Sequence, residues 1–438
     1  MPDIEPKPLL VAVDMGYGHL RAARPLAEAL GVELVHVDRA PLAASEERRL
    51  WQRVRRGYEA ISRLSQLPVL GAPLRGVLDS LTAIPHLYPL RDLSAPTPGA
   101  RALERLLRRG LGSGLVERLR SSGAPLLTTF YSPAIAADRA GHERIFCVVT
   151  DSDINRVWAP LEPERTRIQY LVPSQRAGRR LASYGVPRER ITFTGFPLPD
   201  SLVGGPGLAT LKRNLAARLV RLDPARAFRR FLGEEMTHFL GPLPGGEEGR
   251  PPLLAFAVGG AGAQADLPRR FLPALRPAIE SERLRVTLVA GTRPEVADRF
   301  REAAFEARLE GSLGRGLQIL LAGDHDEYFS SFDALLSGAD VLWTKPSELT
   351  FYAALGLPLV CGPPVGMHEH YNRRWARENG AGLKQRDPRF AVQWIEDWLQ
   401  DGTLAGAAWS GYVRLPKFGL HRILAALGET GAAAPRGR

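Results

Sequence analysis

The sequence has little cysteine, little lysine and no long apolar run. Its two cysteines, Cys147 and Cys361, stand in apolar, strand-like segments without a CxxC pair or a Cys/His pair at metal-ligand spacing. We expect both to be inert core residues in a reducing compartment. No apolar run approaches the roughly 18 residues of a membrane span, and the acidic, proline-rich N-terminus does not resemble a signal peptide. These absences predict a cytoplasmic protein that meets membranes only at their surface.

Positive charge, in contrast, is abundant and is carried mainly by arginine. The formal net charge is +11, and only five of the 58 basic residues are lysines. Such a surface suits anionic lipid, a phosphorylated substrate or nucleic acid, and charge alone does not separate these partners. Because no recognisable nucleic-acid module or aromatic stacking platform accompanies the charge, we expect no nucleic-acid partner.

The length of the chain and the order of its apolar segments predict two α/β domains. At 438 residues the chain is too long for one ordinary core. Short strand-like runs alternate with helical stretches up to about residue 195, and the alternation restarts near residue 251. We therefore predict an N-terminal domain, a basic helical linker, a C-terminal domain, and a final helix and tail, at residues 1–200, 201–250, 251–408 and 409–438. Ligands of such sheets bind beyond the carboxyl ends of the strands.

A pair of glycines follows the first predicted strand, in the segment Gly16-Tyr17-Gly18-His19. A dinucleotide-binding turn needs a third glycine where this chain has Arg21, and no Walker lysine is present. Asp38 does stand where such a turn places its acidic ribose ligand, so a dinucleotide site is one alternative. At a helix entrance, the imidazole of His19 can accept a proton from an acceptor hydroxyl. The other interpretation is a histidine that only caps the helix.

Two loops of the second half have residue types that suit a nucleotide. Gly259, Gly260 and Gly262 follow a predicted strand, where backbone amides and a helix N-terminus can approach a diphosphate. The alternative is a tight turn without a ligand. Lys345 and Ser347 open a later loop that can meet phosphate or ribose.

A short histidine pair in the same half raises the question of a metal. His368 and His370 alternate along the chain, but no third ligand lies near them in the sequence. We therefore expect no metal site.

Four segments, in order, resemble the diacylglycerol glycosyltransferases, which include monogalactosyldiacylglycerol synthases and processive diacylglycerol glucosyltransferases. The first is the Gly16–His19 loop, and the second runs from Val149-Thr150-Asp151 through Trp158 to Thr194-Gly195-Phe196-Pro197. The third and fourth are the glycine-rich loop at 256–264 and the segment 344–382. The glycine-rich loop and the last segment also resemble the related peptidoglycan N-acetylglucosaminyltransferase.

The resemblance implies an α/β protein of GT-B architecture, with two Rossmann-like, doubly wound domains facing across a cleft. It implies a UDP-sugar as donor substrate, no bound metal and no cofactor. On the acceptor side it implies His19 as the catalytic residue, with Gly16, Tyr17 and Gly18 beside it. Asp151, at a strand end, is expected to orient His19 or to bind the acceptor, and the alternative is a helix cap. The donor-binding residues expected in the second half are Gly259, Gly260, Gly262, Gln264, Gly291, Lys345, Pro346, Ser347, Glu348, Leu349, Thr350, Met367, His368, Glu369 and Asn372.

The last segment departs from the family pattern in one respect. The ribose-binding glutamate of the family falls here at Phe351 or at Ala353, depending on the alignment. Glu348 is the only acidic residue between Asp340 and Glu369, so we expect it to bind the ribose hydroxyls. The alternative is a glutamate that only favours a helix start, with an altered donor pocket.

These observations predict a metal-independent, inverting glycosyltransferase that moves a sugar from a UDP-sugar to a hydroxyl acceptor such as a membrane lipid. Its alternatives are a nucleotide-sugar epimerase of the same fold and a non-catalytic UDP-sugar-binding protein. The segments 45–64 and 101–119 surround apolar helical faces with arginines, which predicts peripheral binding to anionic membranes. The alternative is that these are core helices with solvated arginines.

Overall fold

The computed structural model of the chain describes residues 5–14, 16–64, 83–244, 250–259, 262 and 264–432. The chain divides into two compact units. The first unit consists of residues 1–198, 365–371 and 418–438, and the second of residues 199–364 and 372–417. The first division follows Leu198, one residue after the Thr194-Gly195-Phe196-Pro197 segment and two residues before the predicted domain end at residue 200.

A wholly parallel, six-stranded sheet of order β2-β1-β3-β4-β5-β6 forms the centre of the first unit. Val11 of the first strand pairs with Val35 on one side and Thr128 on the other. The central strands are short and buried on both faces, as in parallel sheets covered by helices on both sides. The strands are β1 (Leu9–Ala12), β2 (Leu34–His36), β3 (Leu126–Thr128), β4 (Ile145–Val148), β5 (Ile168–Val172) and β6 (Ile191–Phe193).

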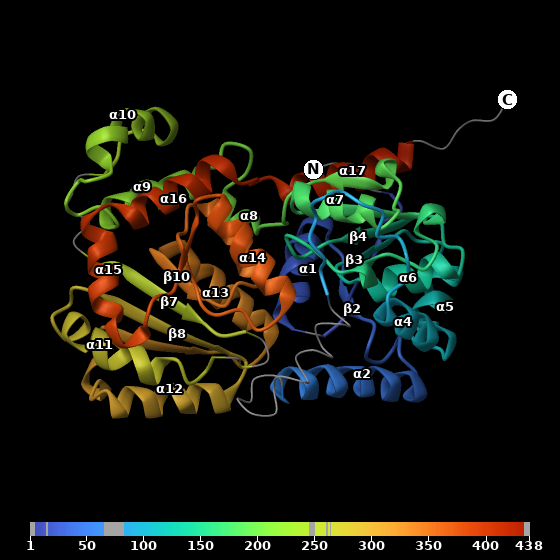
Figure 1. Cartoon of the computed structure of the whole chain (residues 1–438), viewed down its shortest axis with the longest axis horizontal. Helices are drawn as coiled ribbons and strands as arrows, with labels where there is room; N and C mark the ends of the chain where they lie inside the picture. The colour runs from blue at the N-terminus through green and yellow to red at the C-terminus, as the bar shows by residue number, and fades with distance from the viewer. Residues whose placement is uncertain are drawn as a thin grey trace. The chain divides into compact units, whose positions relative to one another are not determined.

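Helices flank this sheet (Figure 1). Its α-helices are α1 (Tyr17–Leu30), α2 (Ser45–Leu64), α4 (Pro98–Arg108), α5 (Ser113–Ser122), α6 (Tyr131–Arg139), α7 (Gln175–Ser183) and α17 (Gly419–Ala432). Short 3-10 turns follow as η1 (Arg156–Trp158), η2 (Pro163–Arg165) and η3 (Arg188–Arg190).

The last helix belongs to the first unit although it ends the described chain. Residues 409–438 were predicted as a separate helix and tail. Residues 409–417 belong to the second unit, whereas α17 belongs to the first unit and packs on α1. Gly419 lets the start of α17 approach the backbone after β6, because a Cβ there would lie 2.0 Å from the carbonyl oxygen of Phe196. Arg422 also donates to the carbonyl oxygen of Thr194 at 3.4 Å.

The second unit repeats the architecture around a parallel sheet of order β12-β11-β10-β7-β8-β9. Its strands are β7 (Leu253–Ala257), β8 (Arg285–Gly291), β9 (Leu317–Leu321), β10 (Val341–Thr344), β11 (Leu359–Cys361) and β12 (Gly382–Lys384). Its core centres on Trp343, whose ring stacks on Phe271 at 4.6 Å and meets Trp394 edge-on at 5.2 Å. Two units with doubly wound parallel sheets confirm the predicted α/β fold class.

The helices of the second unit include the segment predicted as a linker. Residues 201–250 contain α9 and α10, and these helices are part of the unit itself. Its helices are α8 (Asp200–Val203), α9 (Ala209–Arg221), α10 (Arg229–Leu240), α11 (Pro268–Glu280), α12 (Pro294–Glu306), α13 (His325–Gly338), α15 (Ala391–Gln400) and α16 (Thr403–Arg414). The 3-10 helices are η4 (Glu310–Ser312), η5 (Glu348–Leu355) and η6 (Pro388–Phe390). Helix α14 (Met367–Glu378) begins in residues counted with the first unit and ends in the second.

Both cysteines are free and buried in strands, as predicted. Cys147 lies in β4 and Cys361 in β11. Burial raises the pKa of the Cys361 thiol to about 12, and it raises the pKa of Cys147 still further above its usual range. Since the thiolate is the nucleophile and the metal ligand, these thiols are inert in the folded protein.

The two segments predicted to bind membranes, residues 45–64 and 101–119, form α2 and most of α4 and α5. In α4 and α5 the apolar side chains of Leu103, Leu107, Leu115 and Leu119 belong to the core of the first unit. In α2 the side chains beyond Val54 lie outside the described residues. No helix in the described part of the chain is long and apolar enough to cross a membrane.

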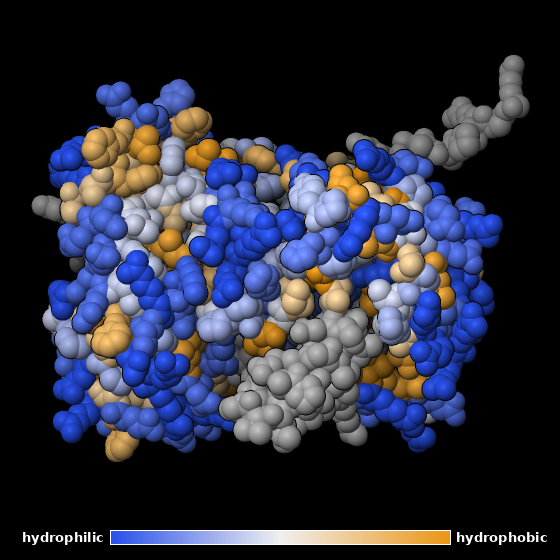
Figure 2. Space-filling model, viewed as in Figure 1, coloured by the Kyte–Doolittle hydropathy of each residue, from blue (hydrophilic) through white to orange (hydrophobic). Residues whose placement is uncertain are grey.

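Figure 2 shows an apolar area over α10, where Phe231 and Phe239 are 73% and 51% exposed.

Candidate functional site

In the first unit the order of the strands reverses between β1 and β3. The chain passes from β1 outward to β2, and then from β3 outward to β6 on the other side. At such a switch point the loops after the two central strands diverge, which makes it the usual ligand position in open α/β sheets. Gly16 ends the loop after β1, and His19 lies in the first turn of α1, which follows that loop. The loop after β3 contains Thr129 and Phe130. Sequence reasoning had therefore placed His19 at the favoured edge of the sheet.

His19 is bound to the strand end across the switch point. Its Nδ1 atom lies 2.8 Å from the carbonyl oxygen of Thr129, and the Thr129 hydroxyl donates to the His19 carbonyl oxygen at 2.9 Å. The hydroxyl oxygen of Thr150 lies 3.3 Å from the same Nδ1 atom. Because a carbonyl oxygen only accepts, Nδ1 carries the proton and the lone pair of the neutral ring is on Nε2. Helix α1 has Gly16 as its N-cap, and the hydrogen bonds described for the His19 ring run to Thr129 and Thr150, which lie outside this helix.

The ring of Phe130 packs against this histidine and joins it to an aromatic cluster. The ring of Phe130 meets the His19 ring edge-on, with 4.6 Å between their centroids. Tyr131 lies 4.3 Å from Phe130 and 5.2 Å from Trp158, whose carbonyl oxygen accepts from the hydroxyl of Tyr170 at 2.8 Å. Sequence reasoning missed Thr129, Phe130 and Tyr131. The available signal was their place directly after the predicted strand "PLLTTF", which ends at the same sheet edge.

The two aspartates after β4 have different surroundings. Asp151 is partly buried, and it does not cap the following η1 turn, whose N-cap is Asn155. Asp153 is fully buried and accepts from Arg180 at 2.8 and 3.0 Å and from Arg176 at 2.7 Å. A buried carboxylate needs such partners. The role predicted for Asp151 beside His19 stays a prediction.

The second unit has its own switch point, between β7 and β10. The two strand ends are joined by the Thr344 hydroxyl, which donates to the carbonyl oxygen of Ala257 at 3.0 Å. The side chain of Lys345 crosses directly over Gly259, because a Cβ at Gly259 would lie only 2.1 Å from the lysine Cε. The predicted glycine-rich loop and the predicted lysine loop are therefore in contact.

The glycine-rich loop begins with a tight turn. The Gly262 amide donates to the carbonyl oxygen of Gly259 at 2.7 Å, and Gly262 has a φ of 71°, which favours glycine. The predicted residue Gly260 lies outside the described residues. Gln264, also predicted to bind the donor, donates to the carbonyl oxygen of Pro363 at 2.8 Å and packs over Gly362. Gln264 thereby ties the loop after β7 to the loop after β11.

Two further predicted positions lie at the same edge of the second sheet. Gly291 ends β8, where its carbonyl oxygen accepts from the Ala322 amide at 2.9 Å. Pro346 follows Lys345 and is buried. Both residues shape the loops around the switch point.

The loop after β10 divides into exposed and buried residues. Ser347 is the N-cap of η5, and Glu348 is its first residue and half-buried. Leu349 and Thr350 are buried, and the Thr350 hydroxyl donates to the Ser347 carbonyl oxygen at 2.5 Å. Within 345–350, the polar side chains of Lys345, Ser347 and Glu348 are the partly exposed ones.

The positions where related enzymes have their ribose-binding glutamate are part of the core. Phe351 is 3% exposed, and its ring packs 5.0 Å from the ring of Trp375. Ala353 is fully buried. Neither residue can present a group to a ligand, which agrees with the departure noted in the sequence.

The predicted donor residues at the start of α14 are divided between the units. Met367, His368 and Glu369 are counted with the first unit, and the fully buried Asn372 with the second. Glu369 is 2% exposed and accepts from the amide of Val365 at 2.7 Å. The first turns of α14 are held in the first unit by Tyr371, whose hydroxyl donates to the carbonyl oxygen of Ile84 at 3.1 Å. In the part of the chain that is described, no group of three or more His, Cys, Asp or Glu side chains is arranged to hold a metal ion.

A buried arginine, Arg218, forms hydrogen bonds to the elements on either side of the loop after β10. The Arg218 guanidinium donates to the carbonyl oxygens of Leu355 and Gly356 at 2.9 and 3.0 Å, at the end of η5. It also donates to those of Ala339 and Leu336 at 2.8 and 3.2 Å, at the end of α13. Full burial lowers the pKa of Arg218 to about 10. One side chain thus fixes the elements before and after the Lys345 loop.

Comparison with solved structures supports the architecture. The S. aureus MnaA–UDP co-structure matches with a TM-score of 0.52 at 11% identity, covering 97% of this chain and 96% of that chain. The UDP-GlcNAc 2-epimerase from Neisseria meningitidis bound to UDP-GlcNAc matches with a TM-score of 0.50 at 11% identity, covering 95% and 99%. At 11% identity, the similarity to these two structures shows only that the chains share a fold.

A sequence relative supplies the second finding. The processive diacylglycerol beta-glucosyltransferase of Bacillus mycoides (strain KBAB4) is 22% identical over 260 residues, which are 59% of this chain. The two parallel sheets and these matches show that the chain has the GT-B fold, with two Rossmann-like units. The match spans about half of that relative, 54% of its length. No family model matches this GT-B chain.

We predict that Arg218→Met destabilises the second unit of this GT-B protein by at least about 3 kcal/mol, since several buried carbonyl oxygens lose their donor at once. Arg213→Met is the matched control, because Arg213 is exposed on the same helix. Urea denaturation followed by circular dichroism measures both. Equal transitions in Arg218→Met and the parent would show that the carbonyl oxygens do not depend on this guanidinium.

Proposed function

We propose that the protein is an inverting glycosyltransferase that moves a sugar from a UDP-sugar to a hydroxyl acceptor, without a metal or a cofactor. The proposal is carried by one observation: each unit places polar groups of the required type at the switch point of its sheet. It is also supported by the sequence similarity to a diacylglycerol glucosyltransferase. That similarity makes a membrane lipid our proposed acceptor.

In the proposed reaction His19 is the general base. The Thr129 carbonyl oxygen holds the ring in the tautomer whose Nε2 atom accepts a proton. Nε2 removes the proton of the acceptor hydroxyl while the acceptor oxygen forms a bond to the anomeric carbon of the sugar. The bond between that carbon and the UDP oxygen breaks, and UDP leaves from the opposite face. Inversion at the anomeric carbon follows from this single displacement.

The loops of the second unit meet the charge of the departing diphosphate. Lys345 lies over Gly259, so its ammonium group stands at the start of the glycine-rich loop, where it can bind a phosphate. Donors that are already in place stabilise developing negative charge without reorganising during the reaction. We therefore assign the diphosphate to the surroundings of Gly259 and Lys345, and the ribose to Glu348.

A second candidate is a nucleotide-sugar epimerase, because solved structures of this fold include a UDP-GlcNAc 2-epimerase bound to its nucleotide sugar. The two functions differ in their need for an acceptor. Incubation with UDP-N-acetylglucosamine alone would yield an epimer or free sugar only if the chain is an epimerase. Incubation of a UDP-sugar panel with diacylglycerol in mixed micelles should yield UDP and a glycolipid if the chain is a transferase. Binding of UDP-sugars without any turnover would contradict both enzymatic proposals.

We predict that His19→Ala reduces transfer by about 10²–10⁴-fold, the usual cost of losing a general base. The affinity for UDP should stay the same, because His19 acts on the acceptor proton. Initial rates of UDP release and calorimetry with UDP measure the two effects. His238→Ala, at an exposed histidine of α10, is the control. Turnover of His19→Ala within a few-fold of the parent would remove His19 from the mechanism.

We predict that Glu348→Gln weakens UDP binding about ten-fold or more, because a carboxylate accepts from two adjacent ribose hydroxyls with charge-assisted hydrogen bonds. The matched control is Glu310→Gln, since Glu310 is also the first residue of a 3-10 helix but is exposed. Calorimetric titration with UDP and with uracil measures the difference. If Glu348→Gln and the parent bind UDP equally, the ribose is held by another group.

A further inference from the structure

The outermost strands of the two sheets differ in length and charge. Strands β2 and β6 border the first sheet, and β12 and β9 border the second. β2, β6 and β12 are three residues long, whereas β9 (Leu317–Leu321) is five residues long. Its sequence, LQILL, contains no charged residue and no proline. Because proteins protect sheet edges by keeping them short or charged, β9 is the least protected of these edges in length and charge.

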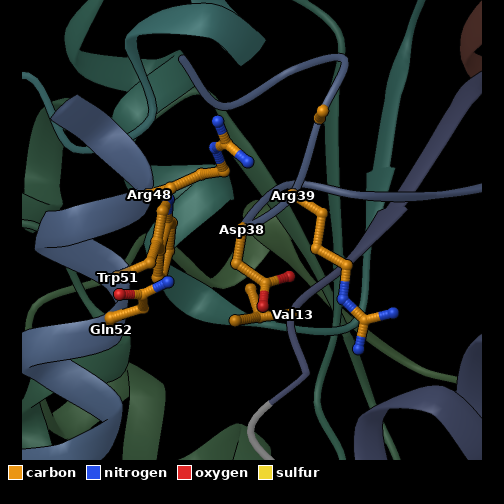
Figure 3. A pocket seen from close by; sticks show the side chains of 7 residues that line it. Val13, Asp38, Arg39, Arg48, Trp51 and Gln52 are labelled. Carbon is orange, nitrogen blue, oxygen red and sulfur yellow. The ribbon is translucent and has the colours of Figure 1, made fainter. Parts of the chain in front are cut away.

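The β2 edge of the first sheet has a contrasting arrangement. β2 ends at His36, and the charged residues Asp38 and Arg39 follow it closely. A pocket of about 480 Å³ lies between this end of the strand and α2, and Arg48 and Trp51 of α2 line it. Figure 3 shows Asp38 facing the side chains of α2, while the Arg39 guanidinium points away from that helix. Charged side chains and a helix therefore flank the end of this short strand.

Hydrogen bonds at the two ends of β9 fix the direction of its backbone groups. The amide of Val286 in β8 donates to the carbonyl oxygen of Gly316 at 2.9 Å, just before β9. The amide of Ala322, just after β9, donates to the carbonyl oxygen of Gly291 at 2.9 Å. Along a strand the backbone groups of alternate residues point to the same side. The even-numbered residues of β9 therefore face β8, and the odd-numbered residues face away from it.

The odd-numbered residues of β9 form the outer edge of the sheet. The carbonyl oxygen of Leu317 accepts from the Gly314 amide at 2.9 Å, which agrees with this direction. In the part of the chain that is described, the amides and carbonyl oxygens of Ile319 and Leu321 have no hydrogen-bond partner on this side. Such a row of open donors and acceptors is a template for a further strand.

Apolar side chains accompany these open backbone groups. Leu321 is 36% exposed, and Ile319 is half-buried. Leu313, which is 40% exposed, lies beside the start of β9, because it forms a bridge with Leu317. A strand added to this edge would cover these side chains while its backbone bonds to Ile319 and Leu321. The edge therefore fits a strand that is itself apolar.

Strand β9 is complementary to a second copy of itself. When two copies pair antiparallel with Leu320 on the two-fold axis, Ile319 of each copy lies opposite Leu321 of the other. Residues that are opposite each other in this way exchange both of their N–H···O bonds, so every open backbone group of Ile319 and Leu321 gains a partner. An interface of this kind closes after two copies and leaves neither β9 edge open.

Charges beyond the ends of β9 favour the same arrangement. Arg315 precedes the strand and Asp324 follows it, and both residues are exposed. With Leu320 on the axis, position 316 of one copy lies opposite position 324 of the other, so Arg315 of each copy stands next to Asp324 of the other. Asp326 and Glu327 add negative charge at the same end. A parallel pairing in register would instead place the arginines of the two copies side by side, and likewise their acidic residues.

We propose that β9 pairs antiparallel with β9 of a second copy of this chain, so that the sheets of two second units join into one continuous sheet. The inference does not rest on the proposed catalytic function. Strands β7 and β8 separate β9 from β10, so the interface does not use the Lys345 loop.

Sedimentation velocity of the full chain over a range of concentrations measures dimer formation. Ile319→Pro removes an outward amide and no hydrogen bond to β8, so we expect the dissociation constant of the dimer to rise about ten-fold or more. Leu321→Lys places a charge on the paired edge and should have the same effect. Phe390→Lys is the matched control and should dimerise like the parent, because Phe390 is 51% exposed in η6, beyond the opposite edge strand β12. Thermal unfolding of each variant confirms that it is folded.

Two further measurements test the direction of pairing and its place. Arg315→Glu should weaken the dimer, because antiparallel pairing brings the new carboxylate next to Asp324 of the other copy. Amide hydrogen exchange of the peptide 317–321 should be slower at a concentration where the parent is dimeric than at one where it is monomeric. In Leu321→Lys the exchange of this peptide should be equal at both concentrations.

Each other outcome overturns the inference. A parent that stays monomeric at every concentration would contradict it, and so would association that continues beyond a dimer. A dimer that is as strong in Leu321→Lys as in the parent would place the interface elsewhere, and this variant decides the question if Ile319→Pro does not fold. Equal dimer strength in Arg315→Glu and the parent would contradict the antiparallel register. A dimer that Phe390→Lys weakens equally would depend on general surface apolarity instead of β9.

Discussion

Parallel pairing of β1 with β3, and of β7 with β10, is the constraint on which both candidate sites depend. Parallel strands end at the same edge of a sheet, so the loops that follow them meet there even when they are far apart in sequence. His19 and Thr129 are separated by 110 positions yet share two hydrogen bonds. Gly259 and Lys345 are brought into contact in the same way in the second unit. Reversal of the strand order at these pairs opens the edge to a ligand.

Buried charged side chains hold the loops around these edges. Arg218 bonds only to backbone carbonyl oxygens in the contacts described, while Arg180 pairs with the buried carboxylate of Asp153. Glu47, in contrast, is a buried acceptor: its carboxylate accepts hydrogen bonds from backbone amides at the start of α5. Removing one partner of such a contact leaves a buried polar group unsatisfied, which costs more than the contact itself contributes. These side chains therefore fix the loops that they contact in one conformation. Two of the three are arginines, the residue that carries most of the positive charge of the chain.

The two units place different functional groups at their switch points. In the first unit a backbone carbonyl oxygen sets the tautomer of a histidine, and the ring of Phe130 packs against it, which suits proton transfer from a hydroxyl. In the second unit a lysine lies across a glycine turn, which suits binding of a diphosphate. Neither arrangement alone identifies a reaction, because GT-B proteins include enzymes that transfer sugars and enzymes that epimerise them. The two kinds of enzyme differ in their need for an acceptor.

The α/β class, the position of His19 at a sheet edge and the burial of both cysteines could be predicted from the sequence, because each depends on a short local pattern. Alternating apolar runs specify strands and helices, and a glycine pair after a strand specifies a tight turn at its carboxyl end. Only the tertiary structure decided that Thr129 orients His19, that Arg218 supports the Lys345 loop and that residues 365–371 and 418–438 join the first unit. It also decided that Leu349 and Thr350 are buried while Glu348 is half-exposed. The physical reason is that these partners come from remote segments, and their contacts arise from packing of the whole chain rather than from any preference of the residues beside them.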